Sequence, residues 1–176
     1  MATRWTLGLN KYDHDVSAVL LRDGVPVIGI AKERLTREKH AGGLPDAAVG
    51  YCLKAAGISF NDLTRIVQNS YALRVPELEW DLLSRTHALH LPGEERELLD
   101  ASPLFLSREA VTISHHLAHA YSAFAVCPFE QGAVLVIDGI GSHRRDVTEP
   151  LPAGDTGHGA DRESESAYVF RGAEIV

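Results

Sequence analysis

Residues 5–31 read WTLGLNKYDHDVSAVLLRDGVPVIGIA and contain three short apolar runs. The runs cover residues 5–9, 16–21 and 25–31, and turn-forming residues such as Asp23 and Gly24 separate them. Short apolar runs divided by tight turns predict strands that pair antiparallel with their neighbours. We therefore expect the chain to open with a three-stranded meander.

The remainder of the chain alternates helical and strand-like patterns. Pro45 precedes apolar residues at helical spacing and Gly57 follows them, which predicts a helix with Pro45 in its first turn and Gly57 at C′. By the same patterns we expect strands at 63–68, 109–114 and 131–138, a helix at 115–126, and strand-like segments at 168–170 and 174–176. Residues 76–101 indicate two surface helices broken at a Pro-Gly pair, and the polar residues 142–165 indicate a mobile loop. This order predicts an α/β fold.

The composition is that of an ordinary globular protein. Of the 176 residues, 45% are hydrophobic and 23% are charged, which excludes a wholly disordered chain. The formal net charge of −7 and the lack of any run of Lys or Arg argue against a nucleic-acid partner. Cys52 and Cys127 are the only cysteines, so a disulfide framework is not expected. No signal-peptide pattern occurs, and no apolar stretch approaches the roughly 20 residues that span a bilayer. We therefore expect a cytoplasmic protein without a membrane partner.

The sharpest local motif is Ser-His-His-Leu-Ala-His-Ala at residues 114–120. His115 and His119 are four residues apart, so on a helix both imidazoles lie on one face and could bind one divalent metal ion. Asp138 ends an apolar strand that we expect to be buried, and it is the candidate carboxylate ligand. Histidines at this spacing also occur as surface or capping residues of a helix. A His-Glu-x-x-His protease is disfavoured because His116 occupies the position of the glutamate.

Two further polar segments contain candidate substrate-binding residues. Asp13 and His14 lie between the first two expected strands, where they could bind phosphate or, for the histidine, transfer a proton near neutral pH. Arg34, Lys39 and His40 lie in a segment dense in charge, and cationic side chains suit phosphate oxygens. An ordinary polar hairpin and a solvated charged connection remain the alternative interpretations.

Together these motifs resemble the N-terminal domain of the carbamoyltransferase family, which includes the nodulation protein U type and the tobramycin and cephamycin carbamoyltransferases. The resemblance rests on four ordered segments within residues 7–141. They are residues 7–18, Glu33-Arg34-Leu35-Thr36-Arg37-Glu38-Lys39-His40, the motif at 114–120, and Ile137-Asp138-Gly139-Ile140-Gly141. The resemblance implies an α/β, actin-like (ASKHA, ribonuclease-H-like) mixed sheet flanked by helices, with the first half of the fold only.

The resemblance also implies an activity and its ligands. His115, His119 and Asp138 would bind a divalent metal ion, usually iron, with zinc as the other option. Carbamoyl phosphate and ATP would form carbamoyladenylate in a C-terminal YrdC-like domain. The N-terminal domain would then pass the carbamoyl group to a hydroxyl of a small-molecule acceptor, often an antibiotic or a sugar. His14 would be the catalytic acid/base or a contact of the carbamoyl group. The other substrate-binding residues would be Asp13, Arg34, Lys39 and His40.

Members of this family are several times longer than 176 residues. We therefore expect residues 1–176 to form a partial N-terminal carbamoyltransferase domain that lacks the YrdC-like domain. Such a chain would be a fragment, or it would need a complementing C-terminal chain or homodimer formation. The alternatives are a non-catalytic metal- or nucleotide-binding module, an actin-like sugar kinase, and a metallohydrolase.

Overall fold

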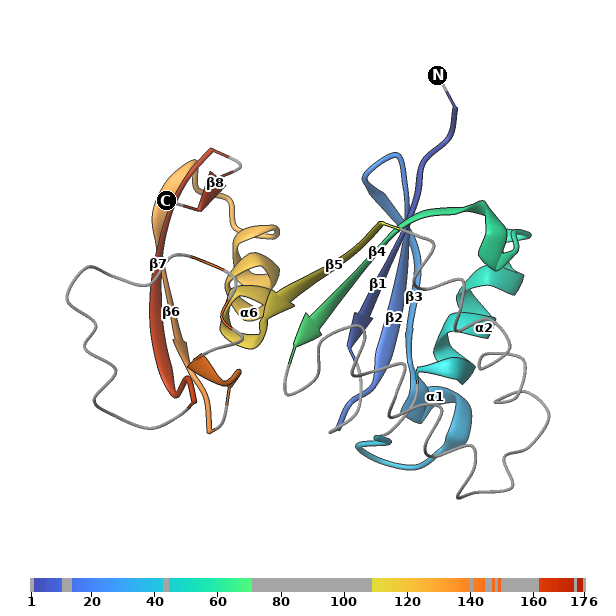
Figure 1. Ribbon diagram of the computed structural model, residues 1–176, viewed down its shortest axis with the longest axis horizontal. Helices are drawn as coiled ribbons and strands as arrows, with labels where there is room; N and C mark the ends of the chain where they lie inside the picture. Colours follow the sequence, from blue (N-terminus) through green and yellow to red (C-terminus); the bar gives the residue numbers. More distant parts are fainter. Residues whose placement is uncertain are drawn as a thin grey trace. The chain divides into compact units, whose positions relative to one another are not determined.

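The computed structural model describes residues 2–10, 14–42, 45–70, 109–139, 141–144, 147, 149, 162–172 and 174–175 (Figure 1). Its contacts divide the chain into two compact units. The first consists of Met1–Gln68 and Leu73–Thr112, and the second of Asn69–Ala72 and Ile113–Val176. Each unit has its own hydrophobic core.

The first unit is built on a five-stranded sheet in the order β3-β2-β1-β4-β5. Its strands are β1 (Trp5–Asn10), β2 (Ser17–Arg22), β3 (Val25–Ala31), β4 (Leu63–Ser70) and β5 (Glu109–Ser114). The first three strands pair antiparallel, whereas β1 and β4 pair in parallel. The opening meander is therefore confirmed, and the sheet is mixed.

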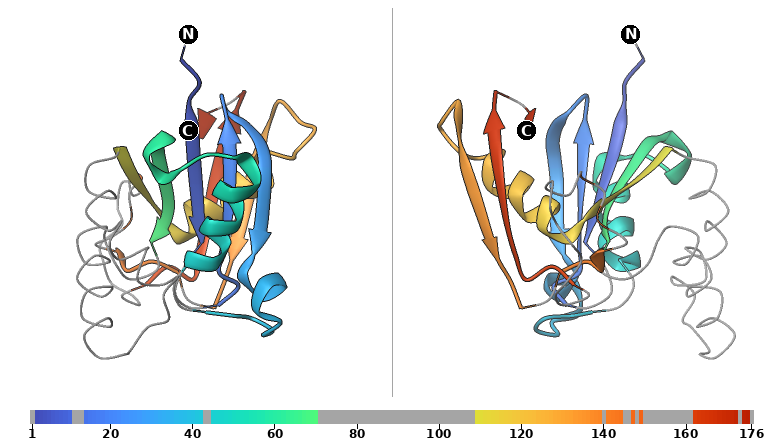
Figure 2. Two further views of the ribbon diagram at one scale, coloured as in Figure 1. Left: turned by 90° about the vertical axis from the view of Figure 1, so that its right-hand side faces the viewer. Right: turned by 60° about the vertical axis from the view of Figure 1, so that its left-hand side comes forward.

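Helix α2 (Asp46–Ala56) packs against β2 and β3 and covers one face of this sheet (Figure 2). The apolar residues that it buries in the core are Ala48, Val49 and Cys52. Burial of each larger apolar side chain in such a core contributes about 1.5–3 kcal/mol. The helix ends at Gly57, whose φ of 67° is left-handed, as predicted. Pro45 is the N-cap residue and so precedes the first turn instead of lying within it.

A short helix, α1 (Lys32–Thr36), lies between the meander and α2 and was not expected. None of its residues is buried, so the segment lacks the apolar periodicity by which a helix is recognised in a sequence. Arg37 ends the helix with a left-handed φ of 60°. A single 3₁₀ turn, η1 (Phe60–Asp62), precedes β4.

The second unit contains α6 (His115–Phe124), β6 (Gln131–Ile137), β7 (Glu165–Arg171) and β8 (Glu174–Ile175). Its strands form an antiparallel sheet in the order β6-β7-β8. Helix α6 packs against β6 and β7, and the buried residues of this core are Leu117, Ala120, Val136 and Tyr168. Mixed sheet and flanking helices together confirm the α/β class that the actin-like resemblance implies.

Strand β6 corrects one expectation. We expected a buried strand, yet Leu135 and Ile137 are 66% and 70% exposed. Alternate side chains of a strand face opposite sides of the sheet, and the side that contains Val136 is the one that packs into the core. The ends of other elements shift slightly, since α6 ends two residues early and β7 begins at Glu165, three residues early.

Several expectations fall outside the described residues. They concern the two helices at 76–101, Asp13, and most of the loop at 142–165. The division of the family's domains, with a partial N-terminal domain here, stays a prediction. Among the helices of the described residues, none is long and apolar enough to cross a bilayer.

Candidate metal centre

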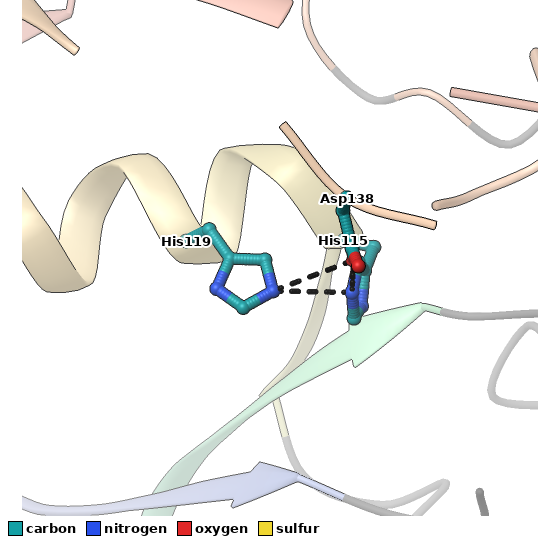
Figure 3. Close-up of side chains that lie close together, drawn as sticks. All are labelled: His115, His119 and Asp138. Carbon is teal, nitrogen blue, oxygen red and sulfur yellow. Dashed lines mark hydrogen bonds and ion pairs between the residues drawn. The ribbon is translucent and has the colours of Figure 1, made fainter. Parts of the chain in front are cut away.

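Three side chains of the second unit converge at the start of α6. His115 and His119 project from successive turns of this helix, and Asp138 follows the last residue of β6 (Figure 3). The Nε2 atom of His115 lies 2.7 Å from Oδ2 of Asp138 and 3.2 Å from Nε2 of His119. The Nε2 atom of His119 lies 3.7 Å from the same carboxylate oxygen. The structure thus brings together the three residues that the sequence predicted as metal ligands.

Backbone hydrogen bonds place both parts of this cluster. The backbone N–H of His115 donates to Oγ of Ser142 at 2.8 Å, so a residue beyond β6 caps the N-terminus of α6. Ser114, the N-cap residue by position, makes no side-chain cap, and its hydroxyl donates to Glu149. The Asp138 carboxylate accepts the N–H of Gly139 at 2.7 Å, which fixes the orientation of that side chain.

The electrostatics favour the protonation states that a metal ion requires. Burial lowers the pKa of His115, although the hydrogen bond to Asp138 opposes this effect. Burial alone would raise the pKa of Asp138, but the N–H of Gly139 and the His115 side chain outweigh it, so the pKa is lowered. A neutral imidazole and an ionised carboxylate are the ligand forms of these groups.

The donor set fits a transition-metal ion. Two Nε2 atoms at 3.2 Å cannot both carry protons without repulsion, and both also lie near one carboxylate oxygen. A single cation that accepts three lone pairs satisfies this convergence better than any one pattern of protons. Two imidazole nitrogens and one carboxylate oxygen suit iron or zinc. That these residues hold a metal stays a prediction.

The remaining predicted site residues belong to the first unit. His14 and His40 both contact the carboxylate of Asp15, each through Nδ1 at 2.8 Å. Arg34 is largely exposed and forms a 3.5 Å ion pair with Glu33, and the Lys39 side chain is exposed. The structure therefore brings His14 and His40 together, while Asp13 lies outside the described residues.

Sequence reasoning missed Asp15 and Ser142. Asp15 directly follows His14, and an aspartate next to a candidate acid/base histidine is a usable signal. Ser142 caps α6 from 27 residues away, and no local pattern reveals such a contact. The sequence instead favours Ser114 as the cap, because serine at the N-cap position commonly caps a helix.

The chain is similar in sequence to a family of known proteins. Residues 5–109 match the family model described as carbamoyltransferase N-terminus. The nodulation protein NolNO of Sinorhizobium fredii is 38% identical over 144 residues, a match that covers 75% of this chain and 20% of NolNO. The protein sll1178 of Synechocystis is 31% identical over 159 residues, with 77% of this chain and 25% of that protein covered. The chain thus spans about a quarter or less of these relatives.

Solved structures give a weaker likeness. YeaZ from Pseudomonas aeruginosa is 14% identical, with a TM-score of 0.46 over 75% of this chain and 54% of that one. A second protein, described as similar to the peptidase YEAZ from Pseudomonas aeruginosa, is also 14% identical, with a TM-score of 0.47 over 96% of this chain and 67% of that one.

Proposed function

The chain belongs to the carbamoyltransferase N-terminus family, and on that premise we propose that it is part of an O-carbamoyltransferase. In this proposal the carbamoyl group passes to a hydroxyl of a small-molecule acceptor. The observation that supports it is the convergence of His115, His119 and Asp138 in a chain of this family. Natural products and sugars are the acceptor classes that we propose, with no nucleic-acid or membrane partner.

The proposed donor is carbamoyladenylate, made from carbamoyl phosphate and ATP. A YrdC-like domain, on a longer form of this chain or on a complementing chain, would make this donor. A homodimer is the other assembly that we propose. A metal ion bound by the His115/His119/Asp138 cluster would supply Lewis-acid stabilisation of a carbonyl or phosphate oxygen.

We assign proton transfer to His14. The acceptor O–H proton moves to Nε2 of His14, and the oxygen's electron pair forms the bond to the carbamoyl carbon. The bond from that carbon to the adenylate phosphate oxygen breaks, and AMP leaves with its electron pair. The products are the carbamate ester and AMP, and the imidazolium returns its proton to solvent. Arg34 and Lys39 are proposed to bind the anionic donor, and His40 is proposed to bind the acceptor.

Metal content is the first test. Elemental analysis of the purified chain should find near-stoichiometric iron or zinc, and the His115→Ala/His119→Ala variant should lose it. His143→Ala is the matched control, because it removes a histidine of the same unit outside the cluster. Loss of metal in the control, or none in a well-folded wild type, would contradict the assignment of the cluster.

Transfer is tested separately, with synthetic carbamoyladenylate and a panel of hydroxyl acceptors. A metal-loaded protein that forms no carbamate ester, alone or with the rest of the family's domains supplied, would favour the alternative, a non-catalytic metal-binding module.

A further inference from the structure

One carboxylate in the first unit lies between two imidazoles. Oδ2 of Asp15 is 2.8 Å from Nδ1 of His14, and Oδ1 is 2.8 Å from Nδ1 of His40. The two rings are nearly perpendicular, with centroids 6.5 Å apart. Each oxygen of one carboxylate thus serves a different histidine, and these histidines are 26 residues apart in the sequence.

Two backbone contacts hold this arrangement. The side-chain amide of Asn10 donates to the carbonyl of Asp15 at 2.9 Å, and the N–H of His40 donates to Oε2 of Glu33 at 3.2 Å. Asp15 and His40 have left-handed φ values of 55° and 56°. Aspartate and histidine are among the non-glycine residues that tolerate this conformation best. The left-handed backbone at Asp15 and His40 is therefore compatible with the contacts among the three side chains.

The chemistry of the carboxylate fixes the tautomer of both rings. An ionised carboxylate only accepts hydrogen bonds, and a neutral imidazole has one N–H. Because Nδ1 faces the carboxylate in both histidines, the proton of each neutral ring must lie on Nδ1. The Nε2 atom, on the opposite side of each ring, then carries a lone pair. The side chains of His14 and His40 are 67% and 61% exposed, so both rings are open to solvent.

We propose that Asp15 is a positioning residue that holds His14 and His40 together as Nδ1–H tautomers and presents both Nε2 lone pairs to the hydroxyl acceptor. This inference rests on the proposed function for the identity of the substrate. The Nε2 atom of His14 takes the hydroxyl proton, and Asp15 stabilises the resulting imidazolium through Nδ1–H. The Nε2 atom of His40 is a second acceptor that orients the substrate.

A cation bound among Asp15, Glu33 and His40 is the competing interpretation, since their ligand atoms lie within 4.8 Å of one another. It requires the opposite protonation of His40, because an Nδ1 atom that binds a metal cannot carry a proton. The two interpretations are therefore separated by the position of one proton.

Nitrogen NMR of the ¹⁵N-histidine-labelled chain locates that proton. Long-range ¹H–¹⁵N spectra, recorded at a pH where both rings are neutral, should show protonated Nδ1 and unprotonated Nε2 for His14 and His40. His14→Gln and His40→Asn assign the signals, and asparagine suits the left-handed backbone of residue 40. Protonated Nε2 on His14 would overturn the proposal, as would signals of His40 that change when a chelator is added.

Asp15→Asn is the decisive variant, because asparagine keeps the shape and tolerates the left-handed backbone. Its amide offers one accepting oxygen and one donating NH₂ group, so one of the two histidines must change tautomer. An unchanged spectrum for both rings in a folded variant would overturn the proposal. Circular dichroism of the variant checks that the fold is retained.

In the transfer assay, Asp15→Asn should lower kcat by about 10²- to 10⁴-fold, with a smaller change in KM and an altered pH profile. A lower kcat with the wild-type pH profile would contradict positioning through His14. If the wild type transfers no carbamoyl group, the proposed function fails, while the NMR spectra still decide on Asp15.

Discussion

At the scale of single residues, Gly141 lies between Asp138 and Ser142 in the sequence and is closely packed. A Cβ at this position would lie 2.7 Å from Cβ of Glu163 and 2.7 Å from Nε2 of His116, a fully buried side chain. We expect Gly141→Ala to destabilise the protein by about 1–3 kcal/mol, since the buried ring cannot move aside without overpacking its neighbours. Urea unfolding followed by circular dichroism measures the change.

Gly139 provides the control for that substitution. It lies two residues away, and a Cβ there meets nothing within 4 Å. Gly139→Ala should change the free energy of unfolding by no more than about 0.5 kcal/mol. Equal destabilisation by both substitutions would contradict the close packing around Gly141.

The contacts of the candidate sites differ in how far the sequence predicts them. His115 and His119 are four residues apart, and residues at this spacing lie on one face of a helix. The sequence alone therefore predicts that the two imidazoles are neighbours. The closeness of Asp138 depended on the strand that precedes it, and the structure places its Oδ2 2.7 Å from His115. The link between Asp15 and His40 depends on left-handed residues in two separate turns, and no periodicity encodes it.

At the scale of elements, α2 contains or adjoins two glycines whose replacement by alanine should change the stability in opposite directions. Gly57 ends the helix at a φ of 67°, and a Cβ there meets nothing within 4 Å, so only backbone strain opposes alanine. Gly57→Ala should cost about 1 kcal/mol.

Gly50 lies within α2, is exposed, and has open space where a Cβ would lie. Gly50→Ala should instead stabilise by about 0.5–1 kcal/mol. Thermal unfolding of both variants measures the two signs, and equal signs would contradict the assigned helix end.

Elements were predictable where they bury a periodic apolar face. The meander, α2, β4 and β5 agree with the sequence within about two residues because each contributes side chains to a hydrophobic core. Helix α1 was missed because it buries no residue. The capping of α6 was also beyond local reasoning, because Ser142 reaches its N-terminus only after β6 has returned the chain.

At the scale of the whole molecule, the two units differ in how their sheets are covered. In the first unit, buried residues of β1, β2 and β4 share one core with α2. In the second, Val136 and Tyr168 pack into the core with α6, while the alternate residues of the same strands face away from it. Apart from Gln131, β6 has no polar side chain on either face, so its sequence cannot reveal this difference.

Neighbouring positions on β6 therefore respond oppositely to one substitution. Leu135 is 66% exposed and Val136 is 7% exposed, although they are neighbours in the same strand. Threonine suits a strand at either position, so the difference between the two variants reports burial and not strand propensity. Leu135→Thr should change the free energy of unfolding by about 0.5 kcal/mol or less. Val136→Thr buries a hydroxyl group in the core and should cost about 1–3 kcal/mol.

Chemical denaturation of the two variants measures both values, provided that the unfolding free energy depends on denaturant concentration with the same slope in each. A cost for Leu135→Thr as large as that for Val136→Thr would mean that another part of the protein covers the outer face of this sheet in solution.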